Sequence, residues 1–128
     1  VSIDGASKET YEKLRLGGKW EKINENLECI SKLKEKHNFR FILHFVVQKD
    51  NYHEMEDIIQ LGKKYNADRV WLNKMEDWNV FTNFSDVDIF NSKHPLHTDY
   101  RKQLRSIWPY LGEEKNPMVE VPTLNITT

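Results

Sequence analysis

Cysteine is nearly absent from this sequence, since only Cys29 carries a thiol among 128 residues. A single thiol excludes a disulfide within the chain. It also excludes any iron–sulfur cluster or zinc site that takes several cysteines from this chain. Cys29 falls near the apolar stripe of a helical pattern, so we expect a buried and unreactive side chain.

The sequence also lacks an excess of either charge and any long apolar run. Nineteen basic residues against 20 acidic ones give a formal net charge of -1, which creates no field that attracts nucleic acid or an anionic membrane. No apolar stretch approaches the roughly 20 residues that cross a bilayer, and the amino terminus has no basic-then-apolar signal pattern. We therefore expect a cytoplasmic protein with no nucleic-acid partner and no membrane partner.

The chain does contain enough apolar material for one core, with 38% hydrophobic and 12% aromatic residues. Helical spacing of apolar residues alternates with short runs of β-branched and aromatic residues. The patterns predict helices over residues 7–16, 19–37, 51–65 and 94–111, and strands over residues 1–4, 39–47 and 69–75. The crossovers are too long for hairpins, so we expect right-handed βαβ units and a parallel sheet.

Local signals support several of these elements. Ser7 is placed to cap the first helix, and Gly17-Gly18 is placed to end it. The stretch from Asn51 to Glu54 has the form of a capping box. Residues 39–47 are apolar almost throughout, which is typical of a strand covered on both faces. Pro109 should end or kink the last helix.

Two segments have no sustained period. Residues 76–93 alternate aromatic side chains with Asp and Asn, and we interpret them as an irregular excursion. Residues 112–128 carry two prolines and a short apolar, strand-like piece, and we expect them to form an extended arm. The stretch from residue 78 to residue 90 either lines a substrate cleft or covers a sheet edge.

Candidate ligand-binding residues follow the predicted first strand. Ligands of parallel α/β proteins sit at the carboxyl ends of the strands. Ser2 and Asp4 share one side of that strand end and can hydrogen-bond a hydroxylated ligand such as a ribose. Gly5 permits a turn or the close approach of a ligand. The alternative is a plain Asp4-Gly5 turn before a helix capped by Ser7.

Histidine offers further candidates. His94 and His97 form an HxxH pair that could ligate a metal, but polar residues at a helix entrance explain the pair better. His44 lies inside an apolar strand, where we expect a hydrogen-bonded residue of the core or of a barrel lining and no catalyst. We assign no metal ligand and no catalytic residue in this chain.

Three stretches together resemble a known family. In order they are VSIDGASKETYEKLRLGGKWEKINENLECISKL, VVQKDNYHE and ADRVWLNKM. The set resembles the carboxyl-terminal half of the radical S-adenosylmethionine (SAM) enzyme core, in the branch that often carries a cysteine-rich auxiliary-cluster (SPASM) domain. The most specific part is SIDG, followed by YEKLR and the Gly-Gly break.

The resemblance implies an α/β fold, namely the parallel βαβαβα half of a partial (β/α)6 TIM-like barrel. Residues 1–111 would supply strands four to six of that barrel, and residues 112–128 would be the irregular carboxyl-terminal arm. The parent would be an enzyme that uses a [4Fe-4S] cluster to cleave SAM to a 5′-deoxyadenosyl radical.

Contacts with SAM are implied by the same resemblance. Ser2 and Asp4 match the ribose contacts at the end of the fourth strand. Arg15 matches a position that often meets the SAM carboxylate, which suits a guanidinium fork.

Contacts with the adenine are implied for the two later strands. Val47, within residues 46–48 at the end of the fifth strand, matches a position that packs on the adenine. Leu72 and Asn73 match the sixth strand, where backbone groups meet the adenine edge. The stretch from residue 76 to residue 90 would sit near the substrate.

The chain departs from the family pattern in its missing parts. It has neither the CxxxCxxC loop that binds the cluster nor the glycine-rich motif that binds the SAM amine. We therefore expect SAM and the cluster in a longer parent, and no cofactor on this chain alone, which would be inactive. Its partners would be the missing amino-terminal half of the barrel and an unknown substrate.

Loss of a neighbouring strand would leave backbone groups open along the first strand, so we expect self-association there. A different reading is a non-catalytic α/β binding or assembly module without the cluster. A phosphate-binding barrel half is a weaker alternative, because no glycine-rich loop follows any predicted strand.

Overall fold

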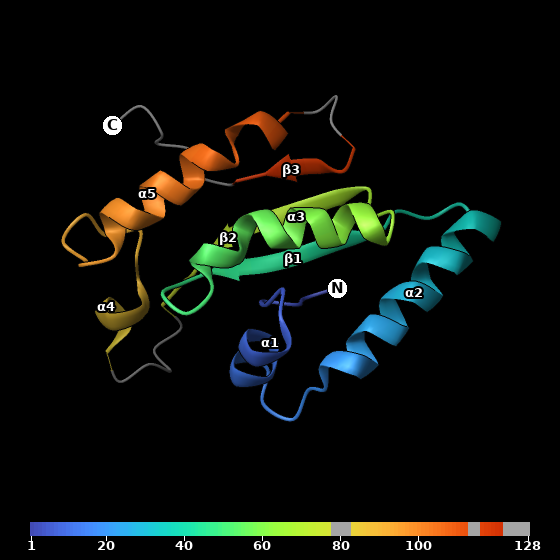
Figure 1. Cartoon of the computed structure of the whole chain (residues 1–128), viewed down its shortest axis with the longest axis horizontal. Helices are drawn as coiled ribbons and strands as arrows, with labels where there is room; N and C mark the ends of the chain where they lie inside the picture. The colour runs from blue at the N-terminus through green and yellow to red at the C-terminus, as the bar shows by residue number, and fades with distance from the viewer. Residues whose placement is uncertain (78–82, 113–115, 122–128) are drawn as a thin grey trace.

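The computed structural model describes residues 1–77, 83–112 and 116–121, which form a mixed α/β arrangement around a small open parallel sheet (Figure 1). The elements are α1 (Lys8–Leu14), α2 (Trp20–Lys36), β1 (Ile42–Val47), the 3-10 helix η1 (Tyr52–Glu54), α3 (Met55–Lys64), β2 (Arg69–Lys74), α4 (Phe84–Val87), α5 (His97–Ser106), the 3-10 helix η2 (Trp108–Tyr110) and β3 (Met118–Glu120). The predicted α/β class with parallel strands is confirmed.

The sheet has the order β1-β2-β3, and both pairings are parallel. The amino-terminal segment joins it beside β1, because the Ile3 N–H donates to the His44 carbonyl at 2.9 Å and the His44 N–H donates to the Val1 carbonyl at 2.7 Å. The predicted first strand is thus a short paired segment with one parallel bridge, between Ser2 and His44.

The predicted arm contributes a strand to this sheet. Met118 lies opposite Arg69, and Glu120 lies opposite Trp71. Residues 113–115 and 122–128 of the arm lie outside the described residues. The strand-like piece expected within the extended arm therefore extends the parallel sheet beyond β2.

One face of the sheet carries the core. Leu43, Phe45 and Val47 of β1 are buried, whereas the residues between them are only partly buried. The prediction that β1 is covered on both faces is wrong. The buried residues pack against α3, which lies along β1 and β2 (Figure 1), and the alternating partly buried residues point to the opposite face.

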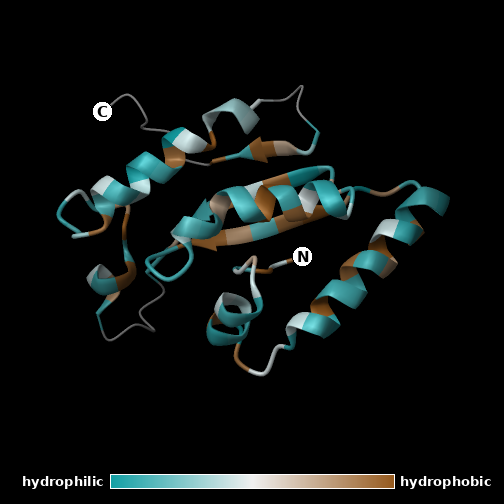
Figure 2. Ribbon diagram, viewed as in Figure 1, coloured by the Kyte–Doolittle hydropathy of each residue, from teal (hydrophilic) through white to brown (hydrophobic). Residues whose placement is uncertain are grey.

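The predicted helices appear with trimmed ends. The Ser7 hydroxyl accepts from the Thr10 N–H, which confirms the cap on α1, and Gly17 adopts a φ of +83° after the helix. Helix α5 ends at Ser106, and Pro109 falls in η2. Figure 2 shows largely hydrophilic helix surfaces towards the viewer, as expected of helices that bury one face.

Cys29 is exposed, so the expectation of a buried thiol is wrong. It lies two residues, or about 200° of helical rotation, from the buried Leu27.

In the irregular excursion, residues 78–82 lie outside the described part, and Phe84–Val87 form the short helix α4.

Candidate functional site

Asp4 and Arg15 form an ion pair at the end of the amino-terminal segment. An Arg15 terminal nitrogen lies 2.8 Å from Asp4 Oδ2, and the two side chains are 39% and 17% exposed. Asp4 Oδ1 accepts from the Val46 N–H at 2.8 Å. Arg15 Nε is buried and has no hydrogen-bond partner among the described residues. The structure thus brings together two of the predicted site residues and leaves one buried donor unpaired.

Asp4 adopts a backbone conformation that few residues other than glycine tolerate. Its φ is +57°, in the left-handed region where Asp and Asn are enriched. The Asp4 carbonyl is held there by the Asn51 amide, which donates to it at 3.1 Å and to the Val46 carbonyl at 2.7 Å. The strained residue is therefore fixed from both its side chain and its main chain.

Asn51 and Glu54 do not form the predicted capping box. Asn51 is fully buried, and its Oδ1 accepts from the Gln48 N–H within the loop after β1. Its amide then reaches the amino-terminal segment, so neither cap contact is made. The capping-box prediction is wrong here because the nearby Gln48 N–H takes Asn51 Oδ1, while donors of Ala6, Ser7 and Thr10, more than 40 positions earlier, take the Glu54 carboxylate.

Glu54 forms hydrogen bonds with the loop that leads into α1 and with the first turn of that helix. This carboxylate is 6% exposed. It accepts from the Ala6 N–H at 2.8 Å, the Ser7 hydroxyl at 2.6 Å and the Thr10 hydroxyl at 3.1 Å. Three donors satisfy a charge that would otherwise be costly to bury. Sequence reasoning missed Glu54 and Asn51 as parts of the site, although a polar pair directly after a strand was a usable signal.

A second group of polar residues lies on the partly exposed face of the sheet. Ser2, His44 and Trp71 occupy one cross-strand row, since Ser2 bridges His44 and His44 lies opposite Trp71. The His44 and Trp71 rings are 4.9 Å apart. Asn73 shares this face, and its amide nitrogen lies 3.3 Å from His44 Nδ1.

The contact with Asn73 bears on which nitrogen of the His44 ring carries the proton. An amide donor at Nδ1 favours the tautomer that carries its proton on Nε2. Burial lowers the pKa of His44, although the Asp4 charge works in the opposite direction. His44 is thus hydrogen-bonded through Nδ1, and we had expected a hydrogen-bonded residue of the core or of a barrel lining at this position.

Val47 and Leu72 occupy the other face. They are 2% and 1% exposed and belong to the core. The structure therefore brings Ser2, Asp4, Arg15 and Asn73 to one side, and it directs the side chains of Val47 and Leu72 away from them. A ligand on the Asp4 side could reach Val47 and Leu72 only through their backbone.

The segment that contains α4 lies near the carboxyl ends of β1 and β2. Lys49, two residues after β1, pairs with Asp86 of α4. Lys74, the last residue of β2, lies over the Phe90 ring at 5.8 Å from its centroid. The described part of the excursion thus lies beside the strand ends, where the sequence suggested a cleft lining or an edge cover.

His94 and His97 fix this segment to α5. His94 Nε2 lies 2.7 Å from the Asp86 carbonyl oxygen, and its Nδ1 accepts from the Leu96 N–H. His97 Nδ1 lies 2.8 Å from the Ile89 carbonyl oxygen. Within residues 1–77, 83–112 and 116–121, no three or more potential ligands gather to hold a metal ion. Both imidazoles serve as loop contacts.

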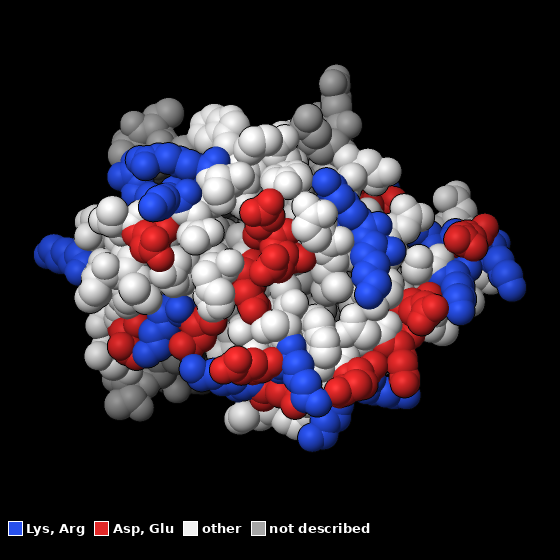
Figure 3. Space-filling model, viewed as in Figure 1, with Lys and Arg blue, Asp and Glu red and all other residues white. Residues whose placement is uncertain are grey.

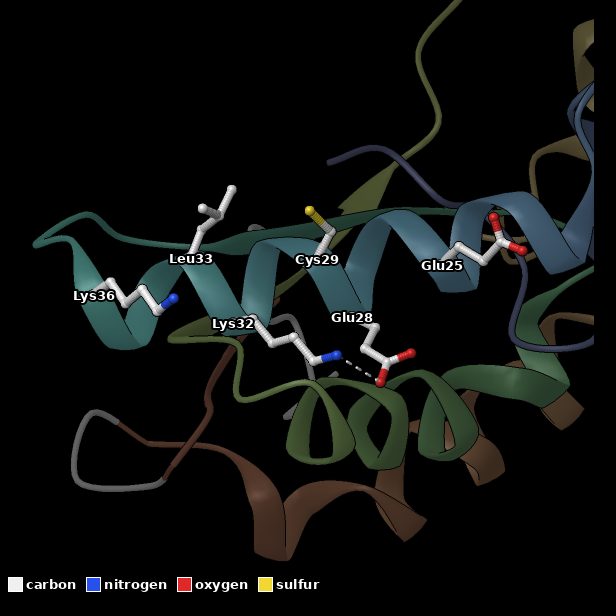
Figure 4. Close-up of a pocket in the computed structure, with 6 residues that line it drawn as sticks. All are labelled: Glu25, Glu28, Cys29, Lys32, Leu33 and Lys36. Carbon is white, nitrogen blue, oxygen red and sulfur yellow. Dashed lines mark ion pairs between the residues drawn. The ribbon is translucent and has the colours of Figure 1, made fainter.

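Two surface hollows lie elsewhere. One of about 280 Å³ is lined only by side chains of α2, including Cys29, Leu33 and the paired Glu28 and Lys32 (Figure 4). The other, of about 200 Å³, lies between α1 and α2 around Gly17 and Gly18. None of the six predicted site residues lines either hollow.

Comparison of the chain with protein-family models, with curated proteins and with solved structures gives no match. Helices within the described ranges are all too short or too polar to cross a bilayer. Assignment of a function therefore depends on the arrangement of side chains around Asp4.

Proposed function

We propose that this chain supplies the SAM-binding half of a radical SAM enzyme, with the [4Fe-4S] cluster and the rest of the barrel provided by a longer polypeptide. The observation that carries the proposal is the placement of Asp4 and Arg15. They are eleven residues apart in sequence, yet they meet at the carboxyl end of a parallel strand segment, which is where α/β proteins bind ligands.

The residues at this end have a donor set that suits SAM. Two of the lone-pair positions of the Asp4 carboxylate are used by Val46 and Arg15, so others remain for ribose hydroxyls. The buried Arg15 Nε is an unpaired donor, which a ligand carboxylate could satisfy. On the same side of the sheet, Ser2 and Asn73 add a hydroxyl and an amide beside His44.

The chain does not fit the cluster. Its single thiol, Cys29, lies exposed on α2, and a [4Fe-4S] cluster needs several thiolates. Bound together, SAM and the cluster would supply a 5′-deoxyadenosyl radical that abstracts a hydrogen atom from a substrate. The part of this chain is to orient the nucleoside and to limit the access of water.

The coding sequence upstream of Val1 provides the first test. The proposal expects a CxxxCxxC motif roughly 80 to 110 residues earlier, to allow for three βα units. The longer polypeptide should be brown and oxygen-sensitive after anaerobic reconstitution. A native start near residue 1, or a colourless parent after reconstitution, would contradict the proposal.

Substitutions in that longer polypeptide test whether Asp4 and Arg15 bind the ligand. Asp4→Ala and Arg15→Ala should each weaken the binding of S-adenosylhomocysteine by about tenfold or more, because each removes a charge-assisted contact. Asp57→Ala, at an exposed position of α3, is the matched control and should bind as the wild type does. Equal affinities in all four proteins would remove Asp4 and Arg15 from the site.

A non-catalytic α/β module is the second candidate, and one observation favours it. Asp4 is already paired with Arg15 and with the Val46 N–H, so both residues could serve only to lock the amino-terminal segment to β1. In that case Asp4→Ala would lower the stability of the chain and leave S-adenosylhomocysteine binding absent in every form of the protein.

A further inference from the structure

The side chains of α5 and η2 form a basic and aromatic surface. Arg101, Lys102 and Arg105 lie on α5, and Trp108, in the turn that follows, is 52% exposed. Arg101, Arg105 and Trp108 are spaced by four and three residues, which places them along one flank of the helix. We name Arg101, Lys102, Arg105 and Trp108 the α5 strip.

The cations of the α5 strip are close together and, in the part of the chain that the structure describes, are not held by acidic side chains. Several lysines and arginines elsewhere pair with acids, for example Lys8 with Glu21 and Lys34 with Asp68. Within the described residues, Arg101, Lys102 and Arg105 make no ion pair. In Figure 3, basic side chains gather over α5 at the upper left of the molecule. Three cations that pair with no acid of the described ranges are thus concentrated on one short helix.

Aromatic surface borders this charge. Trp108 is one of the few large hydrophobic side chains that are exposed by more than half. Tyr110 follows in η2, and its ring lies 4.7 Å from Lys63 Nζ, measured to the ring centroid. Trp108 follows Arg105 by three residues, so the strip offers an exposed indole together with forked hydrogen-bond donors, a combination enriched at protein interfaces.

We infer that the α5 strip is a docking surface for an acidic peptide segment of a partner protein. Arg101 and Arg105 are separated by four residues, or about 6 Å along the helix axis. Alternate residues of an extended peptide are about 6.6 Å apart on the same side. Acidic residues at alternate positions therefore match the two arginines, and a following apolar side chain reaches Trp108.

The size and setting of the strip favour a peptide over a nucleic acid. Its three cations span little more than one turn of helix, and the chain as a whole carries a net charge of -1. Nucleic-acid binding depends on many phosphate contacts and on a broadly basic face. A short acidic peptide needs only the local charge.

Nuclear magnetic resonance on this chain tests the proposal with a defined probe. The probe is the synthetic peptide acetyl-Glu-Ser-Glu-Ser-Leu-Ser-amide, titrated against the ¹⁵N-labelled protein at low salt. Saturable shifts should occur in the amides of α5 and η2 and in the Trp108 indole, which Trp108→Phe identifies. The same peptide with Lys in place of Glu should cause none.

Substitutions show whether the arginines act as a pair. Arg101→Ala and Arg105→Ala should each weaken peptide binding about threefold to fivefold, and the double variant about tenfold or more. Arg40→Ala, which removes an exposed guanidinium before β1, is the matched control and should not alter the affinity. Thermal unfolding of all variants confirms that they are folded.

Three outcomes would overturn the inference. The first is the absence of saturable shifts at millimolar peptide. The second is an equal loss of affinity in Arg40→Ala and Arg105→Ala, which would indicate non-specific charge attraction. The third is tighter binding of an oligouridylate of matched charge, which would assign the strip to nucleic acid.

Discussion

The Glu54 carboxylate accepts a hydrogen bond from the Ser7 hydroxyl at 2.6 Å, across 47 positions of sequence. Ser7 caps α1, and Glu54 lies in η1 after β1. The contact therefore joins the start of α1 to the helical segment that follows β1. Because Asp4 and Arg15 flank the same loop and helix, the geometry of the proposed ligand site depends on this buried carboxylate.

Removal of the Glu54 carboxylate should destabilise the chain. Glu54→Ala leaves the donors of Ala6, Ser7 and Thr10 without an acceptor, and we expect a loss of about 3 kcal/mol in the free energy of unfolding. Glu54→Gln keeps one acceptor oxygen and should cost about 1 kcal/mol. Urea titration provides the measurement. An Asp57→Ala control should be nearly neutral, and an equal effect in both alanine variants would contradict the role of Glu54.

Gly5 should tolerate no side chain. A Cβ at Gly5 would lie 2.5 Å from the Tyr11 backbone nitrogen and 2.7 Å from Tyr11 Cα, and helix backbone cannot yield as a flexible side chain can. We expect Gly5→Ala to cost about 3 kcal/mol by overpacking. Gly17→Ala meets no atom within 4 Å, although its φ is +83°, so it should cost only about 1 kcal/mol. Denaturant titration measures the free energy of unfolding of both variants. A larger loss in Gly17→Ala than in Gly5→Ala would show that the close approach of Gly5 to the Tyr11 backbone is unimportant.

The pH dependence of stability should contain a contribution from His44. Its pKa is lowered below the ordinary 6.5 in the folded chain, so the unfolded state binds more protons at pH values between the two pKa values. Stability should therefore fall as the pH drops through about 6.5 and level off below the folded pKa. Urea midpoints across this range, compared with those of His44→Gln, measure the effect. Identical pH profiles for the two proteins would exclude it.

The Tyr52 hydroxyl should ionise only at high pH. Its hydroxyl donates to Asp99, and this hydrogen bond, with burial, raises the pKa of Tyr52 to about 12. Burial alone raises the pKa of Tyr100 to about 12. Ultraviolet titration of tyrosinate should show a component near pH 12 that shrinks in Tyr52→Phe. Since the folded pKa is raised, stability should be lost as the pH rises from 10 towards 12. If the tyrosinate signal near pH 12 is unchanged in Tyr52→Phe, that signal belongs to other tyrosines.

The amino-terminal segment should promote self-association. Val1 and Ile3 pair with β1 on one side, and Val1 and Ser2 are exposed. Exposed strand edges recruit further strands. Sedimentation velocity should show a concentration-dependent dimer that weakens in Ser2→Pro, which removes a backbone donor. A monomer at all concentrations would count against this expectation.

Much of the fold was predictable because it depends on short-range patterns. The apolar spacing of α2 and α3, the Ser7 cap and the β-branched runs of β1 and β2 are local signals, and local signals define where elements lie. The strand at Met118–Glu120 was harder to recognise, because three residues carry little periodicity. The partners of Asn51 and Glu54 were not predictable, because a capping-box pattern does not reveal that the loop N–H of Gln48 takes Asn51 Oδ1 or that distant donors take the Glu54 carboxylate.

The sequence by itself determined the α/β class, the parallel connections and the inability of this chain to bind a cluster with one thiol. It also placed Ser2 and Asp4 at one strand end, and the family resemblance implied a contact of Arg15 with the same ligand. Only the tertiary structure decided that Asp4 and Arg15 pair, that Glu54 holds the loop between them, and that Cys29 and the α5 strip face outward. The physical reason is that hydrogen bonds and ion pairs depend on distances between segments, and folding sets those distances through the packing of the whole core.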